Sequence, residues 1–233
     1  SGGQVSTTTA TIYILNVPPT LTIASSGSVN EGSTYTITLS SSDPGQDTIS
    51  SWTINWGDGS IQTINGNPSS VSHVYADNGA YTISATATDE DGTYAAPGVA
   101  VTVLNVEPTL AVHGDSTVNE RATYTLTLTS SDPGQDTITS WTIKWGDGVT
   151  QTVNGNPSSV SHTYNTPGTF TISAAATDED GTFGAPEQTV TVNRVPIVVG
   201  ITGPASTDEG ATYTLGLNSG LPSGEQPLSW TIN

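Results

Sequence analysis

The feature that most constrains this chain is a short stretch, WTINWGDG at residues 52–59, that returns as WTIKWGDG at residues 141–148. A third copy begins with WTIN at residues 230–233. The starting positions 52, 141 and 230 are 89 residues apart in both steps. Self-similarity at one fixed interval is typical of a tandem array of small domains, and we expect the array to continue beyond both ends of this sequence.

Apolar and polar residues alternate within each copy. Trp52, Ile54 and Trp56 are separated by polar residues, a period of two that predicts a half-buried β-strand. Two tryptophans on one face bury a large apolar area, so this strand is expected to anchor a core. Gly-Asp-Gly at 57–59 predicts a tight turn, because glycine allows positive φ and aspartate bonds nearby amides. We interpret Asp58 as a turn residue, with no histidine, serine or cysteine fixed at a useful spacing for catalysis.

The composition narrows the fold and the partners. Thr, Ser, Val and Ile dominate and no window shows a helical period, so the chain is predicted to be all-β. It has no cysteine, but a repeat of 89 residues is long enough for a core without disulfides. Three basic against 21 acidic residues give a net charge of −18, which argues against nucleic acid and anionic membranes as partners. This charge suits divalent cations or a salty medium, and equally a surface that is simply soluble and self-repelling.

We expect four segments: the last strand of a preceding repeat at 1–17, complete repeats at 18–106 and 107–195, and the start of a further repeat at 196–233. Each complete repeat holds seven short runs of alternating residues with turn signals between them, which predicts a two-sheet sandwich of immunoglobulin-like topology. Tyr75 and Tyr164 occupy the place of a corner tyrosine in such sandwiches. In the last segment, Tyr213 and Leu215 match the second strand, and the third strand begins at Trp230.

The recurring motifs resemble a known family. In the first repeat these motifs are WTINWGDG at 52–59, His73-x-Tyr75, Gly79-x-Tyr81 and Thr88-Asp89. Together they are similar to the signature of the PKD (polycystic kidney disease) domain, and the resemblance implies tandem immunoglobulin-like β-sandwiches in an elongated array. Asn55 and Lys144 stand where that family usually has an aspartate, which we expect to alter a surface contact more than the fold. Such domains serve as spacers, adhesion modules and accessory domains of secreted hydrolases.

The loops at one end of such a sandwich offer a set of oxygen ligands. In an immunoglobulin-like sandwich the first strand starts at the end where two of the connecting loops gather, and this brings matching residues of each repeat together. They are Asn16, Ser41, Asp43 and Asp89 in the first repeat, and Asn105, Ser130, Asp132 and Asp178 in the second. An all-oxygen set of amide, hydroxyl and carboxylates suits Ca²⁺. The resemblance implies the same positions, because similar residues bind calcium in some PKD domains of secreted collagenases.

A simpler interpretation of these residues stays open beside the metal site. Asp and Asn are common in turns, where their side chains bond the backbone amides that follow. Leu221 stands where Asp43 and Asp132 stand, so the third repeat lacks one ligand and calcium is expected only in the first two. Asp47 and Asp136 lie further along the same loop and are expected to contribute less.

We expect no catalysis from this chain. His73 and His162 recur as part of a structural motif, which predicts a packed or hydrogen-bonded role. Asp89 and Asp91 are the residue types of a glycosidase, but their neighbours indicate a turn at the end of a strand. We find no phosphate-binding loop, no zinc spacing and no Ser-His-Asp arrangement.

The expected function is a non-catalytic structural or adhesive array, a stalk, fibre or surface layer, located extracellularly or at the cell surface. Its partners would be the neighbouring repeats of the same chain, with calcium stiffening the repeat junctions. Other copies, a cell-surface protein or a polysaccharide are further candidate partners; membrane insertion is not expected in this stretch. The alternative is a polysaccharide- or protein-binding accessory region of a large secreted hydrolase. Exposed aromatics at Tyr94 and Phe183 would favour it, although we favour packing over the joint for both.

Overall fold

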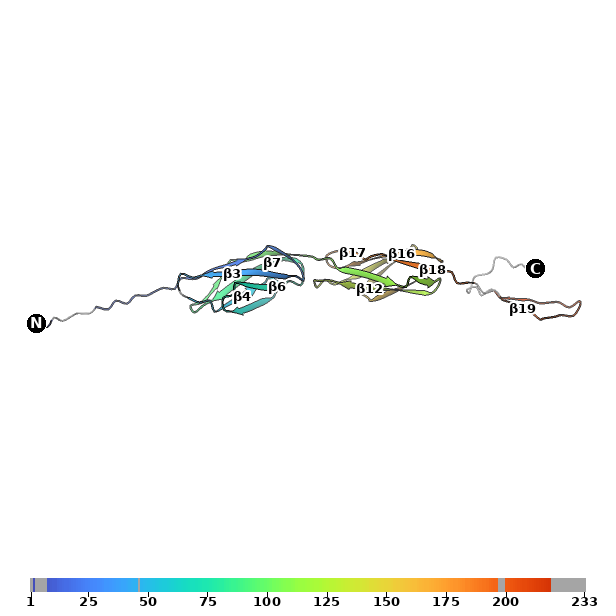
Figure 1. The fold of residues 1–233 in the computed structure, drawn as a ribbon, viewed down its shortest axis with the longest axis horizontal. Coiled ribbons are helices and arrows are strands. Elements are labelled where there is room, and N and C mark those ends of the chain that lie inside the picture. The colour runs from blue at the N-terminus through green and yellow to red at the C-terminus, as the bar shows by residue number, and fades with distance from the viewer. Residues whose placement is uncertain (1, 3–7, 46, 197–199, 219–233) are drawn as a thin grey trace. The chain divides into compact units, whose positions relative to one another are not determined.

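The computed structural model describes residues 2, 8–45, 47–196 and 200–218, and every regular element among them is a β-strand (Figure 1). The all-β prediction is therefore confirmed. The strands of the first repeat are β1 (Thr20–Ala24), β2 (Ser28–Asn30), β3 (Thr34–Ser42), β4 (Ser51–Asn55), β5 (Ile61–Asn65), β6 (Ser70–Val74), β7 (Gly79–Thr88), β8 (Thr93–Ala95) and β9 (Val99–Leu104). Those of the second are β10 (Thr109–Gly114), β11 (Thr117–Asn119), β12 (Thr123–Ser131), β13 (Ser140–Lys144), β14 (Thr150–Asn154), β15 (Ser159–Thr163), β16 (Gly168–Thr177), β17 (Thr182–Gly184) and β18 (Gln188–Asn193).

Each repeat folds into the same pair of sheets. In the first repeat one sheet has the order β1-β3-β6, and the other has the order β2-β9-β7-β4-β5 with β8 paired to β7. In the second repeat the orders are β10-β12-β15 and β11-β18-β16-β13-β14, with β17 paired to β16. This is the immunoglobulin-like sandwich that the alternation of the sequence predicts.

The structure has nine strands per repeat where the sequence predicts seven. The first strand is split at Gly27, whose φ of 83° turns the chain out of one sheet and toward the other. Before the turn β1 pairs antiparallel with β3, and after it β2 pairs parallel with β9. The other additional strand, β8, arises because the Asp89–Gly92 turn folds the chain back onto β7.

One core joins the two sheets of the first repeat. Leu21, Ile37 and Val71 from one sheet share a buried cluster with tryptophans, isoleucines and alanines from the other. Trp52 and Trp56 are completely buried, as expected for the strand that anchors the core. The polar groups of the buried Trp and Tyr side chains form hydrogen bonds, because a buried N–H or O–H group needs a partner.

Those polar bonds recur in both repeats. Trp52 Nε1 donates to Asn67 Oδ1 at 2.9 Å, and the Tyr75 hydroxyl donates to the Trp56 carbonyl oxygen at 2.9 Å. In the second repeat the Tyr164 hydroxyl donates to the carbonyl oxygen of Trp145 at the same distance. The two tyrosines therefore play the corner role that their position predicts.

The chain divides into two compact units that do not follow the repeats. The first is Ser1–Leu110, Ser130–Thr139 and Ala176–Phe183; the second is Ala111–Thr129, Ser140–Ala175 and Gly184–Asn233. The β12–β13 loop and the β16–β17 turn, although they come from the second repeat, thus belong to the same compact unit as the first repeat.

Three contacts within the first unit hold these loops. The backbone N–H of Gln135 donates to the carbonyl oxygen of Ala76 at 2.7 Å. Asn78 Nδ2 donates to Asp180 Oδ1 at 2.6 Å. Gly32, with a φ of 66°, lies so close to Pro133 that a Cβ on the glycine would collide with the proline carbonyl oxygen.

The two terminal segments are less regular than the repeats. Residues 8–17 form no strand, and the last strand of a preceding repeat that is expected in 1–17 stays a prediction. In the last segment β19 (Gly200–Thr202) pairs with β20 (Gly216–Asn218). Tyr213 and Leu215, expected in a strand, lie just before β20 and form no strand themselves. The strand expected at Trp230 lies outside the described residues.

Candidate cation-binding loops

The Gly-Asp-Gly turn at 57–59 is built as expected, but its aspartate has a histidine partner that the sequence spacing did not indicate. Asp58 Oδ1 accepts a hydrogen bond from the Ser60 N–H at 2.9 Å, and Oδ2 lies 2.6 Å from His73 Nε2. The imidazole of His73 stacks on Trp56 with ring centroids 4.7 Å apart. The packed, hydrogen-bonded role expected of His73 is therefore confirmed, and its partner Asp58 is a new finding: β6 brings the imidazole to the turn from 15 residues away.

The second repeat copies this pair, and the copy indicates a structural role. His162 Nε2 lies 2.7 Å from Asp147 Oδ2. Burial raises the pKa of each aspartate, but the hydrogen bonds outweigh it, first that from the histidine, so the pKa falls below its ordinary value. Ser60, which bonds to Asp58, is replaced by Val149 in the second repeat. The repeats thus share the pair without sharing a nucleophile.

Two of the predicted calcium ligands of the first repeat lie on either side of the loop after β3. Ser41, near the end of β3, accepts a hydrogen bond from Asn67 Nδ2 at 2.8 Å. Asn16, in the exposed segment before β1, donates from Nδ2 to the Tyr94 hydroxyl at 2.7 Å. Both side chains are therefore fixed by protein partners, and each retains an oxygen lone pair that could face a cation.

The two predicted carboxylates divide their oxygens between two roles. Asp43 Oδ1 accepts the N–H of Gly45 at 2.6 Å, and Asp89 Oδ1 accepts the N–H groups of Asp91 and Gly92 at 2.9 Å each. These are the turn bonds of the simpler interpretation. The Oδ2 atoms of Asp43 and Asp89 are buried and have no hydrogen-bond partner in the described part of the chain. Turn capping therefore uses only one oxygen of each carboxylate.

Asp47 is placed more centrally than expected. It lines a surface hollow with Ser41 and Asp43, and a neighbouring hollow with Asn16 and Asp91. Burial, and then repulsion from Asp43, Asp91, Glu90 and Asp89, raises the pKa of Asp47 above its ordinary value. The two hollows therefore place three of the predicted residues, Asn16, Ser41 and Asp43, around Asp47, which the position along the loop had ranked below them.

The corresponding residues of the second repeat show the same division of oxygens. Asp132 Oδ1 accepts the Gly134 N–H at 2.7 Å, and Asp178 Oδ1 accepts the N–H of Asp180 at 3.0 Å. Their Oδ2 atoms are buried without a partner among the described residues. Ser130 lies in β12, and Asn105 is exposed just after β9. The calcium set stays a prediction, and the unpartnered buried oxygens are chemically suited to a hard cation.

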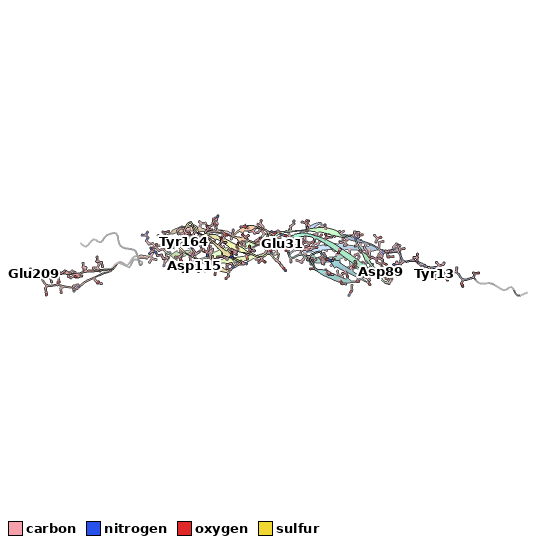
Figure 2. All side chains as sticks on the ribbon, turned by 180° about the vertical axis from the view of Figure 1, so that it is seen from behind. Tyr13, Glu31, Asp89, Asp115, Tyr164 and Glu209 are labelled. Atoms are coloured by element: carbon pink, nitrogen blue, oxygen red, sulfur yellow. The ribbon has the colours of Figure 1, made fainter. Side chains whose placement is uncertain are left out.

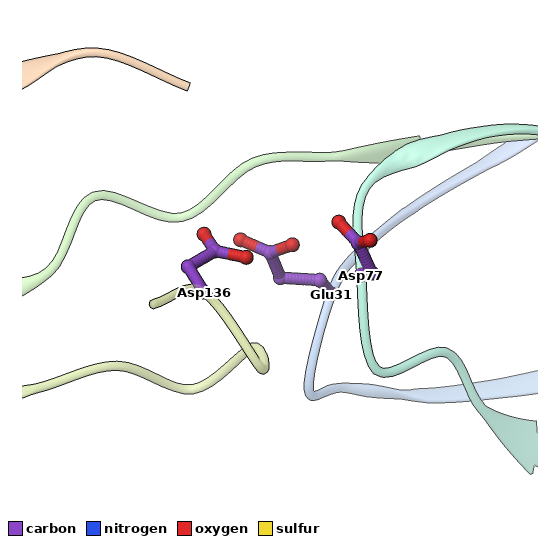
Figure 3. Close-up of side chains that lie close together, drawn as sticks. All are labelled: Glu31, Asp77 and Asp136. Carbon is purple, nitrogen blue, oxygen red and sulfur yellow. The ribbon is translucent and has the colours of Figure 1, made fainter. Parts of the chain in front are cut away.

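The structure adds acidic residues that the sequence analysis missed or ranked low. Glu31, Asp77 and Asp136 each offer a carboxylate oxygen, and the three atoms lie within 4.8 Å of one another (Figure 3). All three belong to the first compact unit. Figure 2 shows Glu31 at the opposite end of the first sandwich from Asp89, so this cluster is separate from the loops around Asp43.

One signal in the sequence points to part of this cluster. A glutamate recurs at positions 31, 120 and 209, always after Asn or Asp and 89 residues apart. In both described cases its Oε1 accepts a backbone N–H, that of Val106 for Glu31 at 2.6 Å and that of Val195 for Glu120 at 2.9 Å. Asp77 has no such signal, because Thr166 occupies its place in the second repeat.

The fold and these loops define a tandem protein of immunoglobulin-like β-sandwiches. The family model of the PKD domain matches residues 16–103 and again residues 105–194. The chain therefore belongs to the PKD-domain family, as its motifs indicate. No curated protein matches the chain significantly.

Several solved structures resemble parts of the chain. The fibronectin(III)-like modules of Clostridium thermocellum CbhA are 22% identical over 75% of this chain and 94% of theirs, with a TM-score of 0.33. The PKD domain of an M14-like peptidase from Thermoplasmatales archaeon SCGC AB-540-F20 is 28% identical over 38% of this chain and 98% of that domain, with a TM-score of 0.33. Red sea bream transglutaminase is 12% identical over 75% of this chain and 31% of its own, with a TM-score of 0.34.

The described residues include no helix of the length and apolar character needed to cross a bilayer.

Proposed function

We propose that this chain is a spacer of an extracellular or cell-surface structural array, a stalk, fibre or surface layer, that carries no catalysis of its own and is stiffened by calcium. The observation that carries the proposal is that loops of the second repeat are built into the compact unit of the first. Repeats of the PKD family are typically extracellular, non-catalytic modules, which agrees with this role.

The contacts of those loops are of the kind that resist bending. The bond from Gln135 to Ala76 is made by backbone atoms, and Gly32 approaches Pro133 more closely than any side chain would allow. In a repeat protein, contacts between neighbouring repeats contribute to stability, and we infer that these backbone contacts limit bending.

The positions of the aromatic side chains support the spacer over the polysaccharide-binding alternative. Polysaccharide recognition would use flat, exposed aromatic rings on the sandwiches. Tyr94 and Phe183 are both half-buried, and Tyr94 accepts a hydrogen bond from Asn16. Among the described residues, the aromatics that stand out as exposed are Tyr13 and Tyr213, which lie outside the two sandwiches.

Calcium supplies the stiffening in this proposal. The buried Oδ2 atoms of Asp43, Asp89, Asp132 and Asp178 have no partner among the described residues. A bound cation would give them one and would screen repulsion in a chain of net charge −18. Asn16 and Asn105 precede the first strand of each repeat, so a cation held there would tie each repeat to its leading segment.

Small-angle X-ray scattering of the chain tests the stiffening, with calcium and with excess chelator. We expect the maximum dimension to increase and its spread to narrow with calcium. The scattering of the Asp43→Ala, Asp132→Ala double variant should not respond, and in calorimetric titration this variant should lose the heat of the Asp43 and Asp132 sets that the unchanged chain shows. Identical scattering in both conditions, or no heat for the unchanged chain, refutes the stiffening. Retention of the chain on insoluble polysaccharide would instead establish the accessory-domain alternative.

A further inference from the structure

The cluster of Glu31, Asp77 and Asp136 has a feature that ordinary acidic surfaces lack. The Glu31 side chain is completely buried, and its Oε2 has no hydrogen-bond partner among the described residues. Both carboxylate oxygens of Asp136 are likewise buried without a partner. Figure 3 shows the Glu31 carboxylate between those of Asp77 and Asp136. A buried carboxylate oxygen without a hydrogen bond is costly, and a bound ligand of opposite charge would offset that cost.

The positions of these carboxylates are fixed by the backbone around them. Glu31 Oε1 accepts the Val106 N–H at 2.6 Å, which leaves Oε2 to point into the cluster. A Cβ on Gly134 would lie 2.8 Å from Glu31 Cδ, so a larger residue there would displace the carboxylate from this position. The bond from Gln135 N–H to Ala76 O brings together the two residues that follow them, Asp136 and Asp77. The oxygens therefore converge without any side chain having to move.

The local charge agrees with the geometry. Burial, and then repulsion from Glu31, Asp132, Asp180 and Glu179, raises the pKa of Asp136 to about 7. Burial is also the main cause that raises the pKa of Glu31 above its ordinary value. Hydrogen bonds from the backbone of Val106 and Asn78 oppose this rise, and repulsion from Asp132 and Asp180 adds to it.

No basic side chain of the same unit can supply that cation. The three Lys and Arg residues of the chain, Arg121, Lys144 and Arg194, all belong to the second compact unit. The one histidine of the first unit, His73, is already paired with Asp58.

We propose that Glu31, Asp77 and Asp136 bind a hard divalent cation, of which Ca²⁺ is the probe. Three carboxylates, one of them exposed and open to water, suit Ca²⁺ because it accepts six to eight oxygen ligands in flexible geometry. The site is distinct from the Asp43 and Asp132 sets of the proposed function, since its central ligand, Glu31, comes from the turn between β2 and β3. Its effect is to fasten the 130–139 loop within the first unit.

The second repeat supplies a matched control. Glu120 occupies the place of Glu31 and makes the same backbone bond, to the Val195 N–H at 2.9 Å. It is partly exposed, and Thr166 stands in the place of Asp77. Glu120 therefore makes the same backbone hydrogen bond as Glu31 but has no carboxylate at the position that matches Asp77.

The experiment is a calorimetric Ca²⁺ titration of the chain in metal-free buffer near neutral pH, with the Glu31→Gln and Glu120→Gln variants. Glutamine keeps the Oε1 acceptor for the backbone N–H and removes the charge. We expect Glu31→Gln to weaken one class of Ca²⁺ site by about tenfold or more, and Glu120→Gln to leave all binding unchanged. Melting in chelator checks that both variants fold. If Glu31→Gln does not fold, Asp77→Asn replaces it, because Asp77 is exposed and outside the core.

Each outcome decides the proposal. Loss of a site in Glu31→Gln, or in Asp77→Asn where that variant is used, with Glu120→Gln intact, supports it. Unchanged Ca²⁺ binding in Glu31→Gln overturns the proposal but does not affect the proposed sites at Asp43 and Asp132. Equal weakening in both glutamate variants also overturns it, because it would indicate a general effect of net charge. Absence of any binding in the unchanged chain overturns it as well. In that case the carboxyls share a proton, and Glu31→Gln should melt higher than the unchanged chain in chelator.

Discussion

The same nine residues, SSDPGQDTI, occur at 41–49 and at 130–138, and they meet different surroundings. In both loops the first aspartate caps the turn, since Asp43 and Asp132 accept the glycine N–H two residues later at 2.6 and 2.7 Å. The second aspartate differs. Asp47 lines open hollows, whereas both oxygens of Asp136 are buried beside Glu31. Local sequence therefore sets the turn, and residues from elsewhere in the chain set the charge around it.

The glycine in this loop shows the same contrast. A Cβ on Gly45 would meet the carboxylates of Asp43 and Asp47, which belong to its own loop. A Cβ on Gly134 would meet Glu31, more than 100 residues away in the sequence. The same glycine is thus constrained by its own loop in the first repeat and by a residue distant in sequence in the second.

The largest expected effect comes from exchanging a residue that the repeats do not share. Gly32 and Arg121 occupy matching positions and have nearly equal φ, 66° and 67°. The backbone therefore accepts arginine in this conformation, but at Gly32 the Pro133 carbonyl stands in the way of a Cβ. Gly32→Arg should reduce stability by about 2–4 kcal/mol, from overpacking together with left-handed strain.

Two measurements check this exchange. Urea unfolding gives the loss of stability, and amide exchange of Gln135 reports whether its bond to Ala76 survives. Arg121→Gly is the control and should change stability by less than about 1 kcal/mol. A Gly32→Arg chain that is as stable as the unchanged one, with Gln135 still protected, would mean that the loop does not depend on this close approach.

A smaller effect is expected where the repeats agree. The pKa of Asp58 and that of Asp147 are lowered in the folded chain by their histidine partners. A lowered pKa gives stability that is present above the ordinary value of about 3.9 and is lost as the pH falls through the folded value. Asp58→Asn and Asp147→Asn should each cost about 1 kcal/mol near pH 7 and flatten the acid side of the stability profile.

The two variants must match for the comparison to hold. Their His–Asp distances are 2.6 and 2.7 Å, and both histidines stack on a tryptophan at 4.7 Å. Urea unfolding from about pH 2 to 7 measures both profiles. A large loss of stability in one repeat and none in the other would show that the same His–Asp geometry does not stabilise both repeats equally.

The sequence predicts the sandwich well because its signals are local. Alternation identifies the tryptophan strand, and the positions of Tyr75 and Tyr164 predict the corner hydrogen bonds that the structure contains. The His73–Asp58 pair was missed although the motif includes both residues. It depends on the register of β6 against β3 and on how the turn folds over it, which residue spacing does not express.

The sites are predicted only in part, and for a physical reason. The oxygens of Asp43 and Asp89 could be anticipated from the end of the sandwich where their loops gather. Glu31 and Asp77 could not, because their importance comes from the approach of the 130–139 loop. The 41–49 loop has the same sequence as 130–138, so the sequence of the loop itself does not indicate that approach. A recurring glutamate every 89 residues is the one signal available, and its backbone bond to Val106 explains that recurrence without a metal.

The smallest expected effect tests the charge difference between the two loops directly. Asparagine at position 43 or 132 keeps the Oδ1 that caps the turn and removes only the charge. Asp132 raises the pKa of both Glu31 and Asp136, whereas the corresponding effect of Asp43 is on Asp47. In excess chelator, Asp132→Asn should therefore gain about 0.5 kcal/mol by relieving repulsion, and Asp43→Asn should gain less. Urea unfolding of both variants measures the difference. Calcium should reverse the sign for both variants, because both aspartates belong to the proposed calcium sets and a bound cation turns their negative charge from a cost into an attraction. Equal gains at both positions, unaffected by calcium, would mean that the two loops differ in shape but not in electrostatics.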